Sequence, residues 1–494
     1  MIPFRYLPRA QGPDGLATST SDLQAKTEKE LQDAWKSAPR PLVLHRMRHL
    51  QWLKMSLFQG LPAKYKAQDA SQPWMLFWIV QSFQIMGVQL DPVTKQRAID
   101  TVMTCQDKVR GGFGGGPMQY PGILPTYAAI SVLVCVGRPG PGGGWDEIDR
   151  HKMYDFFMSL KQPDGSFIVS KDAEVDVRAI YALLVTATLL DIVTPELIAG
   201  TASFIASTQT YEGGFASTSM PYYITEDTLL DEPRPAIGEA HGGYAGCSIG
   251  SWVMLKPLMS EEESQKLDIP KFLRWLVWMQ GEEEDFGGFR GRSNKLVDNC
   301  YSWWCGESLA LVEALLDTQP ETGHEDELIE DDGIDDEWID TDYWLYNNKS
   351  LQEYILGVGQ DKPGGLRDKP GKLADIYHTF YSLAGLSTAQ HRVYQSKTTQ
   401  EQLLGHWEDT DGFIPSSGTK ETSEDRQARR KALWAHLRSW KEDESSHRYV
   451  GSPNNRVNAT HPVFTLLISQ SNGIMDYFYG QNPGKSSSQV ATGE

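Results

Sequence analysis

Five short segments of the sequence repeat one pattern, in which a glutamine is followed within a few residues by glycine and then an aromatic or aliphatic residue. The copies are CQDKVRGGFGG (105–115), KQPDGSF (161–167), TQTYEGGF (208–215), MQGEEEDFGGF (279–289) and GQDKPGGL (359–366). Their glutamines, at positions 106, 162, 209, 280 and 360, lie 56, 47, 71 and 80 residues apart. The two long intervals contain insertions, and without them each interval is close to 50 residues. Such a period indicates stacked supersecondary units that bury a shared core.

The segments between these turns have the apolar spacing of helices rather than strands. RWLVWMQ (274–280) and LLVTATLL (183–190) are examples, and each turn offers a glycine that can end a helix in the left-handed conformation. Kelch-like β repeats have a similar period, but the sequence lacks the period-2 strands that they need. We therefore expect an all-α protein built from helical hairpins.

Insertions and polar ends accompany the repeats. We expect residues 1–40 to form a flexible N-terminal arm, 41–480 the repeat domain and 481–494 a disordered tail. Insertions are expected at 216–239, 317–341 and 392–450. The acidic 317–341 segment lacks helical periodicity and predicts a solvated loop with a partner-binding or a solubilising role. Residues 428–440, inside the last insertion, predict a surface helix.

The composition excludes several classes of function. The formal net charge of −19 disfavours nucleic acid binding, although Glu325–Asp342 alone carries eleven acidic residues. Five cysteines without a CxxC pair predict no disulfide framework. No stretch reads as a signal peptide or a transmembrane segment, so we expect a soluble cytoplasmic protein. The 15 Trp, 20 Tyr and 17 Phe either fill a large core or line a cavity for a long apolar ligand.

A candidate metal site lies in GRSNKLVDNCYSWWC (291–305). Asp298 and Cys300 are close enough to bind one ion from the first turn of a helix, and zinc accepts both carboxylate and thiolate. The alternative is a capping Asp followed by a buried Cys. His378 stands at the head of an apolar helix, where it can equally be a capping or a core residue.

A second group of residues can bind an anion. Arg292 and Lys295 are three residues apart, which predicts one helical face, and with Tyr301 and His241 they can hold a diphosphate through charge-assisted hydrogen bonds. The alternative is an exposed basic face. The two glycines after His241 allow close approach of the backbone, as beside a phosphate or a tightly packed helix.

Two other pairs have simpler interpretations. Glu174 and Arg178 precede an apolar helix with the spacing of an i,i+4 ion pair. Trp74 and Trp78 share one face of a helix, as core residues commonly do.

Read together, these segments resemble the β subunits of protein prenyltransferases, most closely the farnesyl type. The matching pieces are QPWMLFW, GGFGGGPMQYPGILPTYAA, SLKQPDGSF, EVDVRAIYA, EAHGGYAGC, GGFRGRSNKLVDNCYSWW, LRDKPGKLADIYHTFYSLAGLS and THPVF. They occur in family order over most of residues 70–391, with a short return at 460–464. The resemblance implies an α-α toroid of about six helical hairpins, with an inner and an outer ring of helices.

The resemblance also implies a chemistry and partners. Asp298, Cys300 and His378 match the ligands of one Zn²⁺ per β subunit, and the open fourth position takes the cysteine thiol of a protein ending in Cys-aliphatic-aliphatic-X, such as a small GTPase. The thiolate attacks C1 of farnesyl diphosphate and releases diphosphate. The active enzyme is a heterodimer with an α subunit, which nothing in this chain resembles.

Substrate contacts follow from the same resemblance. His241, Arg292, Lys295 and Tyr301 match diphosphate-binding positions, and Asp368 matches the acidic residue that holds Mg²⁺ on the diphosphate. Trp304, Tyr244, Cys247, Arg178, Tyr181, Trp74 and Tyr381 match the isoprenoid pocket. Trp74, Trp78 and Tyr377 match positions that receive the aliphatic part of the peptide, while Glu174 and Arg178 would hold its carboxylate through water.

Three positions distinguish the farnesyl type from the geranylgeranyl type I alternative. Trp74 and Tyr381 match the bulky residues that limit the funnel to 15 carbons, and Asp368 stands where the type I relatives carry lysine. Gly122 replaces a family histidine that helps to bind the peptide carboxylate, so the preference at the X residue stays open. A terpene cyclase would need an acidic cluster, for which only DDGIDD (331–336) offers itself, and a non-catalytic scaffold would not need both a zinc and a diphosphate site.

Overall fold

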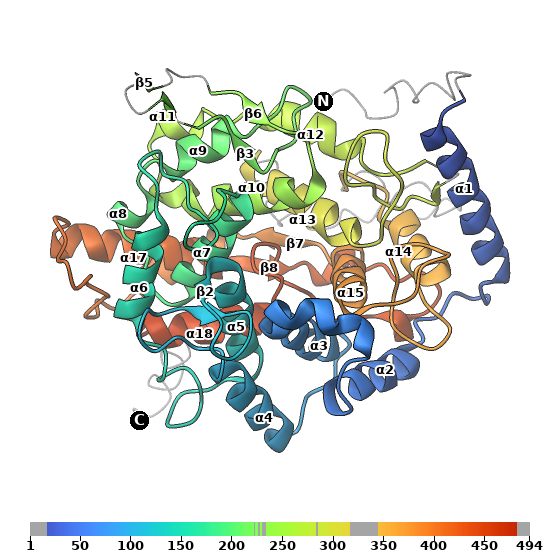
Figure 1. The fold of residues 1–494 in the computed structure, drawn as a ribbon, viewed down its shortest axis with the longest axis horizontal. Coiled ribbons are helices and arrows are strands. Elements are labelled where there is room, and N and C mark those ends of the chain that lie inside the picture. The colour runs from blue at the N-terminus through green and yellow to red at the C-terminus, as the bar shows by residue number, and fades with distance from the viewer. Residues whose placement is uncertain are drawn as a thin grey trace, which may run out of the picture.

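A ring of helices forms the centre of the molecule (Figure 1). The structure is a computed structural model and describes residues 17–221, 223–225, 228–229, 234–282, 285–316 and 344–481. Its inner helices are α3 (Gln72–Ile85), α5 (Ile123–Val136), α7 (Val177–Leu189), α10 (Gly242–Leu255), α13 (Tyr301–Leu315) and α15 (Ile376–Gln390). Each packs on the next in this order and α15 packs on α3, which closes the ring. The inner helices are apolar on nearly every side, because neighbours surround them.

An outer helix precedes each inner helix along the chain. The outer helices are α2 (Arg46–Phe58), α4 (Pro92–Met103), α6 (Arg150–Leu160), α9 (Thr201–Ser207), α12 (Ile269–Val277) and α14 (Asn348–Gly357). They bury one stripe only, such as Phe272, Trp275 and Leu276 of α12. Within the described residues this makes six hairpins, so the expected α-α toroid is confirmed.

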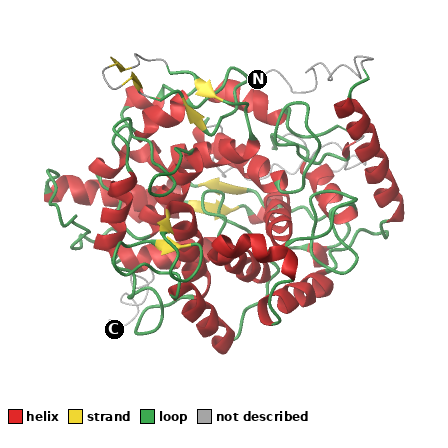
Figure 2. Cartoon of the chain, viewed as in Figure 1, coloured by secondary structure: helices red, strands yellow, loops and turns green. Residues whose placement is uncertain are grey.

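The remaining elements are short or lie outside the two rings. They are α1 (Ser19–Ser37), α8 (Pro195–Ile198), α11 (Glu261–Ser264), α16 (Lys397–Gly405), α17 (Ser423–Arg438) and α18 (Ile468–Tyr479), with 3₁₀ segments at Ala63–Ser71, Lys256–Leu258, Glu444–Ser446 and Pro453–Asn455. The strands pair as antiparallel ribbons: β1 (Phe113–Gly114) with β2 (Pro121–Gly122), β3 (Thr218–Ser219) with β6 (Ala236–Ile237), β4 (Tyr223–Thr225) with β5 (Thr228–Leu229) and β7 (Val393–Gln395) with β8 (Trp440–Glu442). Figure 2 shows how small this strand content is.

Three of the repeated glutamines, Gln209, Gln280 and Gln360, each fasten one hairpin to the next through two hydrogen bonds. The backbone of Gln280 forms an antiparallel bridge with Phe289. Its side chain accepts a hydrogen bond from the N–H of Asn347 and donates one to the carbonyl of Asn347, both at 2.9 Å. Asn347 caps the following outer helix, α14. Gln209 bonds in the same way to Asp268, the cap of α12, at 3.1 and 2.9 Å.

The last repeat is joined to the first by the same device. Gln360 accepts a hydrogen bond from the N–H of His45 at 2.8 Å and donates to the carbonyl of Val43 at 2.9 Å. His45 immediately precedes α2. In these three repeats the glutamine is therefore a link between neighbouring units rather than only a turn marker.

The C-terminal segment fills one end of the ring. The carbonyl of Val463 accepts a hydrogen bond from Tyr181 of α7 at 2.7 Å, and the carbonyl of Thr465 accepts one from Gln81 of α3 at 3.2 Å. Helix α18 packs on α5 and α7. The end of the ring at which the inner helices finish is thus closed by residues that follow the repeats.

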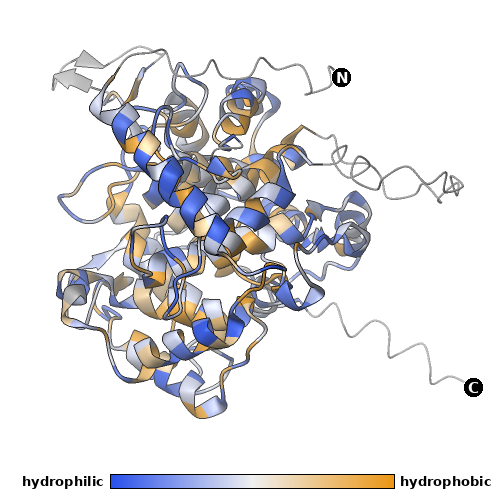
Figure 3. Ribbon diagram, turned by 90° about the vertical axis from the view of Figure 1, so that its right-hand side faces the viewer, coloured by the Kyte–Doolittle hydropathy of each residue, from blue (hydrophilic) through white to orange (hydrophobic). Residues whose placement is uncertain are grey.

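Of two expectations about segments outside the repeats, one was wrong and one is confirmed. Part of the predicted flexible arm is helix α1, which buries Leu31 and stacks Trp35 on Phe286 with ring centroids 5.1 Å apart; Figure 3 shows its largely hydrophilic outer face. The helix predicted at 428–440 is confirmed as α17, one face of which buries Trp434. The Arg430 guanidinium of α17 binds the carboxylate of Asp191, just after α7, at 2.9 to 3.0 Å. The acidic 317–341 insertion, the DDGIDD segment and residues 482–494 lie outside the described residues.

Candidate metal centre and anion site

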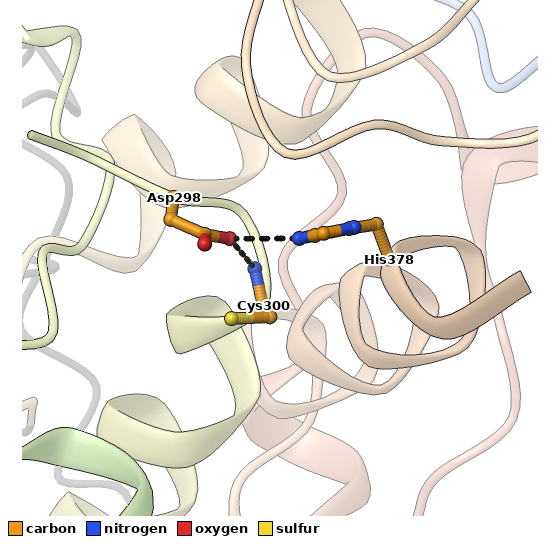
Figure 4. A group of neighbouring side chains, drawn as sticks. All are labelled: Asp298, Cys300 and His378. Atoms are coloured by element: carbon orange, nitrogen blue, oxygen red, sulfur yellow. Dashed lines mark hydrogen bonds and ion pairs between the residues drawn. The ribbon is translucent and has the colours of Figure 1, made fainter. Parts of the chain in front are cut away.

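Three side chains meet where the inner helices α13 and α15 begin (Figure 4). Asp298 lies just before α13, Cys300 is its N-cap residue, and His378 lies in the first turn of α15. His378 Nε2 is 3.2 Å from Asp298 Oδ1. All three potential ligand atoms lie within 4.8 Å of one another. The structure therefore brings together the residues that the sequence predicted as metal ligands.

The local backbone orients each of these groups. The N–H of Cys300 donates to Asp298 Oδ1 at 2.9 Å. Asp375, the N-cap of α15, accepts the N–H of His378 at 2.8 Å with one oxygen and lies 2.7 Å from His378 Nδ1 with the other. With Nδ1–H directed at Asp375, Nε2 faces the other two groups. A carboxylate behind a ligating histidine is the usual outer contact of a metal site.

The donor set fits zinc. A thiol, a carboxylate and an imidazole are all zinc ligands, and three protein ligands leave one position open, as in catalytic sites. Burial, followed by the charge of Asp298, raises the pKa of the Cys300 thiol. Although burial lowers the pKa of His378, its hydrogen bonds with Asp298 and Asp375 raise it to about 10. A divalent cation is the species that would hold Cys300 as a thiolate here.

A histidine and a tyrosine lie beside this centre. His241, the N-cap of α10, accepts the N–H of Gly243 at Nδ1, 3.0 Å away. Its Nε2–H therefore faces the Tyr301 hydroxyl, also at 3.0 Å. Burial, then the charges of Arg292 and Arg178, lower the pKa of His241 to about 4. The imidazole is neutral, and the Tyr301 proton is left free to donate elsewhere.

Glycines make this close packing possible. A Cβ on Gly291 would lie 1.9 Å from Tyr301 Cζ, and one on Gly242 would lie 2.9 Å from the same ring. The expectation that the glycine after His241 allows close approach is confirmed, and the neighbour is Tyr301.

Arg292 and Lys295 are not on a helix, contrary to the prediction from their spacing. They lie in the turn before α13, where Asn294 has a φ of 56°, which no helix allows. Arg292 forms an ion pair with Glu239 just before His241, and Lys295 is exposed. Arg292 still borders the His241–Tyr301 pair, because the N–H of Gly242 donates to the carbonyl of the adjoining Gly291.

Asp368 lies next to the metal centre. Its carbonyl accepts the N–H of Asn299 at 2.8 Å, and its carboxylate forms an ion pair with Lys369. Burial, followed by the charge of Asp298, raises the pKa of the Asp368 carboxyl. The negative charges of Asp298 and Asp368 therefore repel each other, and a cation near them would relieve this repulsion.

Aromatic side chains line the end of the ring at which the inner helices begin. Trp78 packs on Tyr377, Tyr377 on Tyr381, and Tyr381 on Trp304, with ring centroids 5.4, 4.7 and 4.8 Å apart. Trp74 continues the set towards α5, 5.3 Å from Tyr127. Tyr377, Trp304 and both tryptophans of α3 keep part of their surface exposed.

The residues predicted for the isoprenoid pocket lie at different depths. Cys247 and Tyr181 are buried, whereas Tyr244 is partly exposed and lies under the Arg178 guanidinium at 5.5 Å. Arg178 pairs with Asp176 at 2.6 Å and not with Glu174, so the predicted i,i+4 ion pair is wrong. Helix α7 begins only at Val177, which leaves Glu174 in the preceding loop, exposed.

Three residues near the site were not singled out from the sequence. Asp375 orients His378, and its signal was an aspartate three residues ahead of that histidine, the spacing of an N-cap. Glu239 pairs with Arg292. Glu307 of α13 is buried, its Oε2 has no hydrogen bond, and burial raises its pKa well above the ordinary range. No local pattern distinguished it from a surface glutamate.

Comparison with known proteins places this arrangement in a family. The prenyltransferase α-α toroid domain matches residues 44–466. A protein farnesyltransferase subunit beta of Pisum sativum is 35% identical over 72% of this chain and 87% of its own length. That of Schizosaccharomyces pombe is 36% identical over 69% and 77%.

A solved structure shows the same fold. Candida albicans protein geranylgeranyltransferase-I complexed with GGPP aligns with a TM-score of 0.58 and 18% identity, over 88% of this chain and 99% of that one. In the described ranges, no helix has the length and apolar character needed to cross a membrane.

Proposed function

This chain belongs to the prenyltransferase α-α toroid family, among the protein farnesyltransferase β subunits, and on that premise we propose how its residues bind and activate the substrates. The acceptor is the cysteine of a protein ending in Cys-aliphatic-aliphatic-X, and the donor is farnesyl diphosphate. The chain acts as a heterodimer with an α subunit. The observation that carries this proposal is the convergence of Asp298, Cys300 and His378 beside the His241–Tyr301 pair.

We propose that Asp298, Cys300 and His378 hold one zinc ion. Bound there, the ion would lower the pKa of the substrate thiol and fix its sulfur as a thiolate. Asp375 keeps the His378 ring in the tautomer that ligates through Nε2. The sulfur then attacks C1 of the farnesyl chain, the C1–O bond breaks, and its electron pair leaves with the diphosphate.

The residues around His241 are suited to the leaving diphosphate. Tyr301 receives a hydrogen bond from His241 and can give its own proton to a diphosphate oxygen. Arg292 would exchange Glu239 for the diphosphate, and Lys295 can reach it from the same turn. The N-termini of α10 and α13 lie at this point, and helix N-termini favour anions.

We propose that Asp368 binds Mg²⁺ on the diphosphate. The ion would displace Lys369 from the carboxylate, so Mg²⁺ and Lys369 compete for Asp368. Asp368→Ala should therefore raise the Mg²⁺ concentration that gives half-maximal transfer, with little effect when Mg²⁺ is absent.

The aromatic lining would receive the isoprenoid and the aliphatic part of the peptide. Trp304, Tyr244, Cys247, Tyr181 and Tyr381 face the isoprenoid, with Trp74 at its far end, and Trp78 and Tyr377 face the peptide. Arg178, held by Asp176, and the exposed Glu174 are placed to bind the peptide carboxylate through water.

One experiment tests the proposal. The chain is co-expressed with a farnesyltransferase α subunit and offered farnesyl or geranylgeranyl diphosphate with peptides ending in Cys-Val-Ile-Met or Cys-Val-Leu-Leu. We expect farnesyl transfer to the Met peptide, lost in Cys300→Ala and retained in Cys105→Ala, a buried cysteine of the first turn. Preferred geranylgeranyl transfer to the Leu peptide would reverse the subtype, and transfer unaffected by zinc removal would exclude the mechanism.

A further inference from the structure

A second cluster of ligand-type side chains lies at the opposite end of α15. His391 follows the last residue of that helix, Glu442 ends β8, and His447 follows the 3₁₀ segment Glu444–Ser446. Glu442 Oε1 is 2.6 Å from His391 Nδ1 and 2.7 Å from His447 Nε2. The three atoms lie within 4.8 Å of one another.

The orientation of His391 is fixed from behind. Its Nε2 lies 2.7 Å from the carbonyl oxygen of Val457, which can only accept, so Nε2 carries a proton. The other nitrogen, Nδ1, then faces Glu442. A backbone carbonyl behind one nitrogen that leaves the second free is the outer contact found at metal-bound histidines.

The three facing atoms contact one another as ion pairs but form no well-aligned hydrogen bond. His391 Nδ1, Glu442 Oε1 and His447 Nε2 are buried, and their short contacts lack the alignment of hydrogen bonds. The His391 side chain is 0% exposed. A buried polar atom that lacks a well-aligned hydrogen bond is destabilising by about 1–3 kcal/mol. Three such atoms aimed at one point indicate a missing shared partner rather than three separate defects.

We propose that His391, Glu442 and His447 bind a zinc ion that fastens the 392–450 insertion to the toroid. Two imidazoles and one carboxylate form a known zinc donor set, which leaves one position for water. In a tetrahedral site with bonds of about 2.0–2.1 Å, neighbouring ligand atoms are about 3.3 Å apart. The contacts of 2.6 and 2.7 Å would open to nearly the 3.2 Å seen between Asp298 and His378.

The position of the cluster explains what the ion would hold. β7 pairs with β8, and Val393 lies opposite Glu442, so the insertion leaves and rejoins the toroid at this point. A zinc ion would cross-link His391, at the end of α15, to Glu442 and His447, which lie where the insertion returns to the toroid. His378 and His391 are separated by almost the whole of α15, about 20 Å at 1.5 Å per residue, so the ion is distinct from that of the candidate metal centre.

One neighbouring charge opposes a cation. Arg456 Nη2 is 3.7 Å from Glu442 Oε1, but the Arg456 side chain is 52% exposed and can turn towards solvent. The rival arrangement has no metal, with protonated histidines paired to Glu442. The two arrangements differ in the number of zinc ions that the chain retains.

Zinc content separates them. In the full chain purified with its α subunit, we expect two zinc ions per chain by mass spectrometry, one in His447→Ala, one in Cys300→Ala and none in the double variant. His406→Ala, an exposed histidine of the same insertion, should keep two. A single ion in the unchanged protein, lost in Cys300→Ala and kept in His447→Ala, would overturn the proposal.

Two measurements keep the test independent of folding and of the proposed function. His447→Cys should restore the second ion and, after cobalt substitution in the Cys300→Ala background, give a thiolate-to-cobalt charge-transfer band. Added zinc should raise the Tm of Cys300→Ala but not of Cys300→Ala/His447→Ala. Farnesyl transfer by His447→Ala should stay within about twofold, since that residue is far from the reacting groups; absence of transfer in all proteins would count against the proposed function alone.

Discussion

Asp375 holds His378 at two points, with one carboxylate oxygen 2.8 Å from its backbone nitrogen and the other 2.7 Å from its Nδ1. The same side chain therefore begins helix α15 and fixes the ring that faces Asp298. A helix cap and the outer contact of a metal ligand are here a single residue.

Asp375→Asn should weaken zinc binding without abolishing it. The amide still caps the helix but cannot accept the Nδ1–H of His378 as a charged group, so we expect about a 10- to 100-fold loss of zinc affinity in competition with a chelator. Transfer should recover in excess zinc. Asp268→Asn, the same change at the cap of α12, should leave the affinity unchanged; an equal loss there would show a general effect on stability.

Tyr301→Phe should slow the chemical step more than it weakens substrate binding. The change removes the hydroxyl that His241 directs towards the anion, and the loss of one such donor costs roughly 10²-fold in rate. Single-turnover kinetics with farnesyl diphosphate would measure it. Tyr346→Phe removes a hydroxyl bonded to the Thr388 carbonyl instead and serves as the control. A fall in affinity with an unchanged rate would assign Tyr301 to ground-state binding.

Glu239→Gln should tighten the binding of farnesyl diphosphate. Glu239 pairs with Arg292, and both side chains are partly exposed, so the pair is worth about 0.2–1 kcal/mol. Freeing Arg292 should lower the Kd by up to about fivefold, and the gain should shrink at high salt. Glu282→Gln is a charge-matched control in the loop before Arg292. No change in Kd would show that Arg292 does not reach the diphosphate.

Stability should fall as the pH drops below about 6.5, the ordinary pKa of histidine. His461 and His436 are buried, and burial lowers the pKa of each to about 4. Each donates from Nε2 to a backbone carbonyl and accepts at Nδ1, so the neutral ring is satisfied. Between pH 6.5 and 4 the unfolded chain binds protons that the folded chain does not. The stabilising contribution of each neutral histidine is complete above this pH window and is lost within it. The loss at pH 5 is roughly 2 kcal/mol per histidine.

The free energy of unfolding, measured by urea titration at pH 7 and pH 5, checks this prediction. His461→Gln keeps a donor and an acceptor but does not titrate, so its loss between the two pH values should be smaller. His406→Gln, at an exposed position, should lose as much as the unchanged protein. Equal losses in all three would assign the acid sensitivity to other groups.

The repeats predicted the fold because the turn glutamine recurs in five of the six hairpins and the period is recovered once the insertions are removed. The metal centre was predictable through the resemblance, since spacing alone relates Asp298 to Cys300 but not to His378. Arg292 and Lys295 were misplaced because a three-residue spacing occurs in turns as well as in helices. Helix α1 was missed because it buries only Thr27 and Leu31, which leaves little apolar periodicity. The His391–Glu442–His447 cluster joins the end of α15 to two residues of the 392–450 insertion through tertiary packing, and no local sequence pattern indicates such a contact.

The bond from Gln360 to His45 spans 315 residues and completes a circle. An open solenoid can add or lose a terminal unit, whereas this circle has no terminal unit to lose. During synthesis the apolar side of α3 stays uncovered until α15 has been made. At 5–20 residues per second, the time between the synthesis of the two helices is about 15–60 s. A nascent chain of this protein is therefore an incomplete ring for most of its translation, and its dependence on chaperones should be set by that delay.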